Sequence, residues 1–305
     1  MSFDDLATEG INPRTPDLDR IDTLSVLERL NDEDQQVAPA VRLALPALAR
    51  AVDLTLDRWQ RGGRVVLFGA GTSGRLAGLD AAELGPTFGT PADRYLARLA
   101  GGPGAFLKAV EGAEDDRAAG AAAADDLSSL DVAFGIAASG RTPWVLSALE
   151  RARQHRAATI GLACVPQPAL LGYVDVAIVV DTGLEPIAGS TRMKAGTAQK
   201  LVLNAFSSTL MIRLGKVYGN LMVDMQATND KLRRRAERLV QQAAGATPQA
   251  AERALAESRG EVKTAITMLR LSISAAAARE RLAAAEGRLR AVLGEASRVQ
   301  ETQSG

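Results

Sequence analysis

The chain of 305 residues has one cysteine and one histidine, and this scarcity excludes several kinds of chemistry. The single Cys164 cannot form an internal disulfide and fits a reducing compartment. A zinc site usually needs several His or Cys ligands, and a Ser-His-Asp triad needs a placed imidazole. His155 lies in a polar stretch typical of a solvated helix face, and Cys164 lies in an apolar run typical of a strand core. Acid–base catalysis would therefore fall to carboxylates, lysine or tyrosine.

The chain also lacks an excess of charge and a long apolar run. Its 36 basic residues equal its 36 acidic residues, whereas binders of nucleic acid or membrane surfaces need a positive excess. No apolar run approaches the roughly 20 residues of a membrane helix. The start, MSFDDLATEGINPRTPDLDR, is acidic and polar, unlike a signal peptide. We therefore expect a cytoplasmic protein that binds neither nucleic acid nor membrane.

Apolar runs alternate with helix-forming segments in the middle of the chain. This pattern predicts a buried strand at 64–68 and further strands at 93–99, 131–136, 158–165 and 174–180. The segments between them predict helices at 73–84, 104–124 and 142–154. Alternation of this kind is typical of an α/β fold with a doubly wound parallel sheet.

Both flanks of the α/β region have helical patterns. Residues 22–60 carry apolar positions at helical spacing, and 197–217 is a long apolar segment without proline, which predicts a buried helix. Thr247 followed by Pro248 predicts the start of a helix in the Ala-rich tail. The predicted division is an N-terminal helical segment at 1–56, an α/β domain at 57–228 and a small helical region at 229–305.

The first expected strand leads into GAGTSG, residues 69–74, which has the G-x-G-x-x-G spacing of a dinucleotide-binding loop. A dinucleotide site also needs an acidic residue about 20 positions further on, at the end of the next strand, to hold the ribose hydroxyls. The next expected strand ends in Ala100-Gly101-Gly102, and its acid, Asp93, lies at the opposite end. The sequence therefore disfavours an NAD-dependent dehydrogenase.

Hydroxyl groups in this loop favour a different ligand. Thr72 and Ser73 stand at the N-terminus of an expected helix, where hydroxyls and backbone N–H groups together suit a phosphate monoester. A second loop, AASGRTP at 137–143, supplies Ser139 and Thr142 after another strand. Because both loops follow parallel strands, they meet at one edge of the sheet. We predict that they bind one small phosphorylated ligand; the alternative is that both are ordinary capped turns.

Candidate catalytic carboxylates follow the first loop. Glu83 stands just before a Gly-Pro pair that we expect to end the first helix, and Glu111 and Glu114 are three apart, so we expect them on one helix face. Ten residues of helix from Ser73 to Glu83 span about 15 Å, which is too long for one hexose phosphate to bridge. Either this helix is short or bent, or the site combines groups from two subunits.

A third cluster, GSTRMKAGTAQK at 189–200, follows the last expected strand. Its glycines, hydroxyls and cations at a helix start suit an anion or a tightly packed subunit contact. Composition alone leaves both readings open.

Seven stretches, in chain order, resemble the N-acetylmuramic acid 6-phosphate etherase family. They are TEGINP, NDEDQQV, GAGTSGRLAGLDAAE, AVEGAED, GIAASGRTP, GSTRMKAGTAQKLVLN and GKVYGNLMVDMQATN. They cover most of residues 8–229, and the Ala-rich tail resembles the family's UBA-like helical end. The family belongs to the sugar isomerase (SIS) superfamily, so the resemblance implies that 57–228 is a SIS domain.

The resemblance implies a cytoplasmic lyase of peptidoglycan recycling that uses no metal or other cofactor. Such an enzyme cleaves the lactyl ether of N-acetylmuramic acid 6-phosphate to N-acetylglucosamine 6-phosphate and D-lactate, by β-elimination and then addition of water. One carboxylate removes the proton at C2 and another protonates the oxygen that leaves C3. By motif, Glu83 resembles the acid and Glu114 the base, whereas Glu111 is a structural neighbour.

The resemblance also implies the substrate site and its assembly. The residues implied to bind substrate and phosphate are Thr72, Ser73, Ser139, Arg141, Thr142, Arg192 and Lys194. Many SIS domains have S-x-S-x-x-T where this chain has AASGRT, so one hydroxyl is missing, and Arg141 replaces an acidic residue common in isomerases. A homodimer with the site near the subunit interface is implied, with a small sugar phosphate as ligand.

The alternative function is a non-catalytic, sugar-phosphate-binding regulator of the glucokinase regulatory protein type. That relative is much longer than this chain. Presence of both Glu83 and Glu114 favours the enzyme, because binding alone does not need two acid–base groups.

Overall fold

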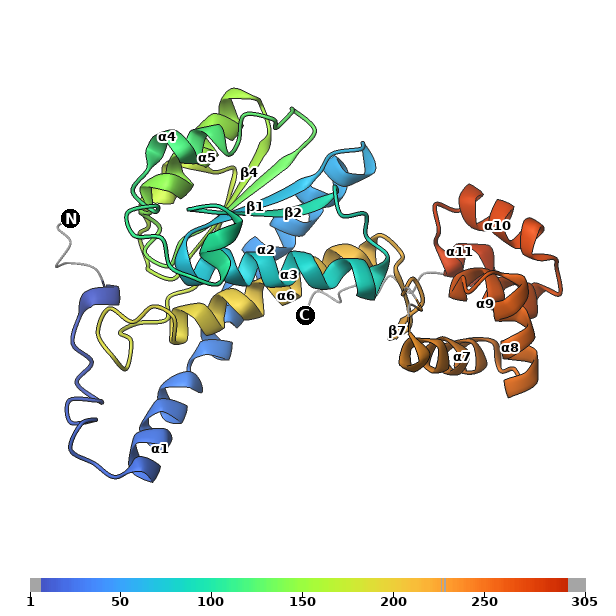
Figure 1. Ribbon diagram of the computed structural model, residues 1–305, viewed down its shortest axis with the longest axis horizontal. Coiled ribbons are helices and arrows are strands. Elements are labelled where there is room, and N and C mark those ends of the chain that lie inside the picture. The colour runs from blue at the N-terminus through green and yellow to red at the C-terminus, as the bar shows by residue number, and fades with distance from the viewer. Residues whose placement is uncertain (1–6, 226, 228, 296–305) are drawn as a thin grey trace, which may run out of the picture. The chain divides into compact units, whose positions relative to one another are not determined.

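The computed structural model describes residues 7–225, 227 and 229–295 (Figure 1). The described chain forms two compact units. The first falls within Met1–Ala82 and Pro91–Leu210, and the second within Glu83–Thr90 and Met211–Gly305. The three-part division expected at 1–56, 57–228 and 229–305 stays a prediction.

A five-stranded parallel sheet forms the centre of the first unit, with strand order β2-β1-β3-β4-β5. The strands are β1 (Val65–Gly69), β2 (Tyr95–Leu99), β3 (Val132–Ile136), β4 (Ala158–Ala163) and β5 (Val176–Val179). The chain direction across the sheet reverses between β1 and β3, and ligands of such sheets bind at the carboxyl ends of the strands at this switch point. Gly69 pairs with Ile136 in register, so the loops after β1 and β3 leave the sheet side by side.

Helices cover both faces of this sheet, which confirms the predicted doubly wound α/β fold (Figure 1). One face carries α4 (Arg117–Ala122) and α5 (Pro143–Gln154), and the other carries α2 (Val37–Gln60), α3 (Gly71–Phe88) and α6 (Lys194–Arg213). Strand residues alternate between the two faces: Phe68 packs with Trp144 of α5, and Phe134 packs edge-on against Phe206 of α6. Helix α1 (Thr23–Asp34) precedes α2.

One expected helix end is wrong, and one expected helix is confirmed with its ends shifted by a few residues. Helix α3 continues through Gly85 and Pro86 to Phe88, because Leu84 and Phe88 are buried and their packing outweighs the local cost of the Gly-Pro pair. Helix α6 begins at Lys194, three residues before its expected start at 197, and ends at Arg213.

The helix expected at 104–124 is also wrong, since that segment has three separate parts. A 3-10 helix covers Pro103–Phe106, residues 111–115 form a turn, and α4 begins at Arg117 with Asp116 as its N-cap. Gly112 has φ +71°, a left-handed conformation that interrupts an α-helix. Glu111 and Glu114 therefore lie on a turn and do not share a helix face.

Besides the ends of α3 and α6, the described residues of the second unit form a short hairpin and the helices α7 to α11. They are β6 (Val217–Tyr218), β7 (Leu221–Met222), α7 (Asp230–Ala244), α8 (Pro248–Glu257), α9 (Val262–Leu271), α10 (Ala275–Ala284) and α11 (Leu289–Val292). Its own core includes Val240 and Ile266, both fully buried. The predicted start of α8 is confirmed: Thr247 caps the helix by accepting a hydrogen bond from the Ala250 N–H, and Pro248 is its first residue.

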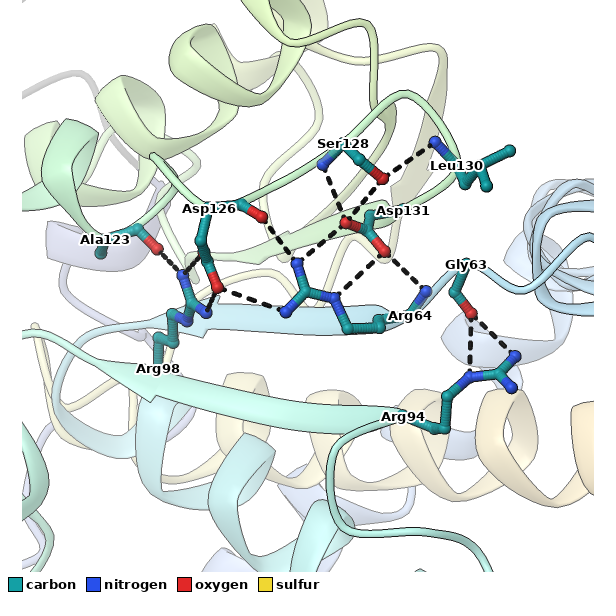
Figure 2. A network of polar contacts seen from close by, with 9 residues as sticks. All are labelled: Gly63, Arg64, Arg94, Arg98, Ala123, Asp126, Ser128, Leu130 and Asp131. Carbon is teal, nitrogen blue, oxygen red and sulfur yellow. Dashed lines mark hydrogen bonds and ion pairs between the residues drawn. The ribbon is translucent and has the colours of Figure 1, made fainter.

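An ionic network joins the starts of β1 and β3 (Figure 2). Buried Asp131 accepts hydrogen bonds from the backbone N–H of Arg64 (2.7 Å), its guanidinium (3.0 Å) and the N–H of Ser128 (2.8 Å). Arg64 also donates a hydrogen bond to the Asp126 carboxylate at 3.2 Å. Arg98 donates hydrogen bonds to both oxygens of that carboxylate, at 2.6 and 2.8 Å. Burial raises the pKa of Asp131, but Arg64 and the backbone N–H groups hold that pKa below its ordinary value. The carboxylate form of Asp131 therefore stabilises this end of the sheet.

Lowering the pH is expected to reduce the free energy of unfolding by protonating Asp131. The pKa of Asp131 in the folded chain is below the ordinary 3.8, so its stabilisation is complete above that value and is lost as pH falls through the lowered pKa. Urea unfolding measured in steps from about pH 6 to about pH 2 should show a steeper loss in the wild type than in Asp131→Asn. Equal slopes in the two proteins would contradict this role.

Candidate functional site

Three glycines shape the turn between β1 and α3. Gly71 has φ +53°, which favours glycine. A Cβ on Gly69 would lie 2.6 Å from the backbone N of Gly74, and a Cβ on Gly74 would overlap the Leu99 side chain. The glycine spacing therefore allows α3 to start in close contact with the ends of β1 and β2. This places buried Ser73 and half-buried Thr72 in the first turn of α3, at the carboxyl edge of the sheet.

The second loop, between β3 and α5, is held in a similarly tight turn. Gly140 has φ +66°, and a Cβ there would overlap Pro168. The Ser139 hydroxyl accepts a hydrogen bond from the Arg141 N–H at 3.3 Å. Thr142 is the N-cap residue of α5 and Pro143 is the first residue of the helix, yet the Thr142 side chain makes no capping hydrogen bond. The Thr142 hydroxyl is thus not consumed by the cap, unlike that of an ordinary capped turn.

A cavity of about 470 Å³ lies between these loops and brings together most of the predicted site residues. Those predicted from sequence that line it are Thr72, Ser73, Glu114, Ser139, Arg141 and Thr142. Gly189 and Thr191, from the third cluster at 189–200, also line it, as do Thr8, Glu9 and Asp115, which sequence reasoning did not select as site residues. The volume is in the range of small-molecule sites.

Glu114 reaches the cavity from the turn at 111–115. Its backbone carbonyl accepts a hydrogen bond from the Trp144 N–H at 2.9 Å, which ties the turn to the first turn of α5. Its side chain is exposed and lines the cavity next to the second loop. Glu111 is exposed and is not among the described residues that line the cavity.

Three predicted site residues, Glu83, Arg192 and Lys194, are not among the described residues that line this cavity. Glu83 is exposed on α3, ten residues after Ser73, and the helix between them is continuous. A short or bent helix, or a site shared by two subunits, would explain the distance that the sequence predicts between Ser73 and Glu83. The continuous helix excludes the first of these, a short helix. Arg192 is exposed in the loop before α6.

Lys194 is buried in an ion pair. Its ammonium lies 2.6 Å from the carboxylate of Glu33 in α1, and their side chains are 1% and 3% exposed. Glu33 also accepts a hydrogen bond from Arg14 at 3.0 Å. Burial raises the pKa of Glu33, but Arg14 and Lys194 hold it below its ordinary value. Lys194 therefore joins the start of α6 to α1 and to the N-terminal segment.

The N-terminus of α6, which the sequence predicted to attract an anion or a subunit, holds an anion of the chain itself. Buried Glu185 accepts hydrogen bonds from the N–H groups of Lys194 (2.8 Å) and Ala195 (2.9 Å). Burial raises the pKa of Glu185 above its ordinary value. Sequence reasoning missed this cap, since Glu185 lies nine residues before the helix.

Within residues 7–225, 227 and 229–295, no group of three or more His, Cys, Asp or Glu side chains is arranged to hold a metal ion. In the same part of the chain, no helix is both long enough and apolar enough to span a bilayer.

Among the comparisons with known proteins, the curated relatives that cover almost the whole chain share one name. A family model for the glucokinase regulatory protein N-terminal SIS domain matches residues 47–153. A protein of Mycolicibacterium smegmatis, named N-acetylmuramic acid 6-phosphate etherase, is 50% identical over 296 residues, which is 96% of this chain and 99% of the relative. A Yersinia pestis protein of the same name is 51% identical over 295 residues, 96% of this chain and 100% of its own. Among solved structures, a phosphoheptose isomerase from Francisella tularensis aligns with 61% of this chain and 98% of its own, at 21% identity and TM-score 0.47.

Proposed function

The chain belongs to the N-acetylmuramic acid 6-phosphate etherase family, whose members are carbon–oxygen lyases, and we propose that it cleaves the lactyl ether of N-acetylmuramic acid 6-phosphate. The proposed products are N-acetylglucosamine 6-phosphate and D-lactate. The observation that carries the proposal is that two hydroxyl-bearing loops and Glu114 line a single cavity at the switch point of the sheet.

The phosphate of the substrate is proposed to lie between the two loops. Ser73 and Thr72 stand in the first turn of an 18-residue helix, whose free N–H groups and dipole favour an anion. Ser139 and Thr142 supply hydroxyls from the facing loop, and Arg141 adds a positive charge beside them. In this arrangement, hydrogen-bond donors from both loops surround a bound phosphate monoester.

The proposed base is Glu114. In the open-chain form of the sugar, the C2–H bond is acidic because it lies next to the aldehyde. Removal of this proton leaves an electron pair that forms the C2–C3 double bond and breaks the C3–O bond to lactate. Water then adds at C3, its hydroxyl bonding to that carbon, while a proton returns to C2. An exposed carboxylate on the cavity wall is suited to this work, because its oxygens are accessible to a substrate bound in the cavity.

The proposed acid is Glu83, which protonates the oxygen that leaves C3. Because Glu83 does not line the described cavity of its own chain, we propose a homodimer in which the partner subunit's Glu83 completes the site. The exposed Arg192 is proposed as a substrate or interface group. Lys194 is buried, which supports a role in positioning the loop before α6. We propose this role for Lys194 instead of direct contact with the substrate.

The second candidate is a sugar-phosphate-binding regulator, favoured by the family-model match over residues 47–153. Purified protein incubated with N-acetylmuramic acid 6-phosphate separates the two candidates. Release of D-lactate, measured by a coupled dehydrogenase assay, supports the lyase. Saturable binding of the intact substrate with no lactate released would support the regulator instead.

A further inference from the structure

We propose that Glu9 is a specificity-determining residue, whose carboxylate accepts hydrogen bonds from the hydroxyl or amide donors of the bound sugar. This inference rests on the proposed function and extends it to a residue of the N-terminal segment. Glu9 ends the 3-10 helix Ala7–Glu9 and lines the same cavity as Ser73 and Glu114.

The N-terminal segment is fixed along the loop that precedes α6. Its Thr8 carbonyl accepts a hydrogen bond from the Gly189 N–H at 2.9 Å. Further along, the buried Thr15 hydroxyl donates to the Pro186 carbonyl at 2.8 Å, and Asn12 donates to the Leu184 carbonyl at 3.4 Å. Three contacts between segments more than 170 residues apart thus hold this segment as a wall of the cavity.

A cluster of charges around the buried Glu33 anchors the same wall. Arg14, on the N-terminal segment, and Lys194, at the start of α6, both contact the carboxylate of Glu33. Because Glu33 is buried and holds both cations, movement of the N-terminal segment would remove one of the two positive charges that compensate it. The position of Glu9 is therefore set by tertiary structure and not by a loose chain end.

The Glu9 carboxylate fills a space that a glycine leaves open. One of its oxygens accepts a hydrogen bond from the Thr8 hydroxyl at 3.3 Å. The other would lie 3.0 Å from a Cβ at Gly189, so the absence of a side chain there makes room for the carboxylate. Gly189 has φ +76°, which also favours glycine.

The charge of Glu9 indicates which part of the ligand it contacts. Among the described residues, no Lys or Arg forms an ion pair with the Glu9 carboxylate. A carboxylate in this state repels a phosphate and accepts hydrogen bonds from neutral donors. We therefore place the phosphate at the two hydroxyl-bearing loops. Glu9 then accepts hydrogen bonds from hydroxyl groups or an amide N–H of the sugar.

Isothermal titration of the full chain with N-acetylglucosamine 6-phosphate and with inorganic phosphate tests the proposal. Glu9→Ala is expected to weaken sugar-phosphate binding about 10-fold or more, as for loss of a hydrogen bond to a charged group, while phosphate affinity stays within about twofold. Glu9→Gln keeps an oxygen acceptor, so its affinity for the sugar phosphate should lie between those of the wild type and Glu9→Ala. Ser73→Ala should weaken both ligands, and Glu28→Ala, an exposed acid of α1, should change neither.

Two outcomes would overturn the role of Glu9. One is unchanged sugar-phosphate affinity in Glu9→Ala; the other is an equal loss for both ligands, which would indicate a general effect on the cavity. Failure of the proposed function has a different signature: the wild type would bind inorganic phosphate no worse than the sugar phosphate and would release no lactate.

Discussion

Replacement of Glu114 by alanine is expected to abolish exchange of the C2 proton with solvent and to lower kcat by about 10²–10⁴-fold, the usual contribution of a general base. Glu114 is the carboxylate predicted from sequence that lines the cavity, on a turn fixed to α5 by the Trp144 hydrogen bond. Removing the carboxylate leaves the phosphate-binding loops intact, so KM should change much less than kcat. Deuterium exchange at C2, followed by NMR in D₂O, measures the step directly.

Glu111→Ala is the matched control for this experiment. Glu111 lies on the same turn, is equally exposed and does not line the cavity, so its loss should leave exchange and kcat near wild type. Retained C2 exchange in Glu114→Ala would remove Glu114 as the base. Loss of exchange in Glu111→Ala, with Glu114→Ala active, would transfer the role to Glu111.

Breaking the buried pair of Glu33 and Lys194 is expected to have the largest effect on stability. Glu33→Gln leaves the Lys194 ammonium buried without a carboxylate, a change that costs about 3–5 kcal/mol in proteins. Lys194→Met should cost less, because Glu33 keeps its contact with Arg14. Urea unfolding of both variants at neutral pH gives the free energies of unfolding.

The double variant Glu33→Gln/Lys194→Met distinguishes a true pair from two independent effects. If the charges stabilise each other, the double variant loses less than the sum of the single losses. Asp57→Asn serves as the control, because Asp57 and Arg61 form an exposed pair, and such pairs contribute about 0–1 kcal/mol. Strictly additive losses at Glu33 and Lys194 would contradict the coupling.

Local sequence patterns were sufficient to predict the strands of the sheet and the two loops after β1 and β3. The five expected strands are present: β1, β3 and β4 are buried along their whole length, whereas the edge strands β2 and β5 are only partly buried. The hydroxyls at Ser73 and Ser139 were recognisable because glycine and proline mark the turns that carry them. Parallel pairing of β1 with β3 then brings both loops to one edge.

Two local features were not predictable from spacing alone. Glu111 and Glu114 have the three-residue separation of a helix face, but the left-handed conformation of Gly112 makes a turn of that segment. The Gly-Pro pair at 85–86 resembles a helix end, yet the buried Phe88 keeps the helix going. In both places, tertiary packing or one backbone angle outweighs propensity.

The parts of the cavity that depend on distant contacts could not be derived from spacing. Glu9 reaches the cavity only because Thr15 and Asn12 bond to residues more than 170 positions away. The burial of Lys194 likewise depends on Glu33, 161 residues earlier. The resemblance of TEGINP to a known family marked the region around Glu9 without assigning it a role.

The most direct test of the proposed reaction is the fate of solvent oxygen and hydrogen when the purified protein acts on N-acetylmuramic acid 6-phosphate. In ¹⁸O-labelled D₂O, elimination and hydration predict ¹⁸O at C3 and deuterium at C2 of N-acetylglucosamine 6-phosphate, with no ¹⁸O in the D-lactate hydroxyl. Label in the lactate hydroxyl with none at C3 would show cleavage on the lactyl side of the ether. That result, or bound substrate that persists unchanged, would contradict the proposed lyase.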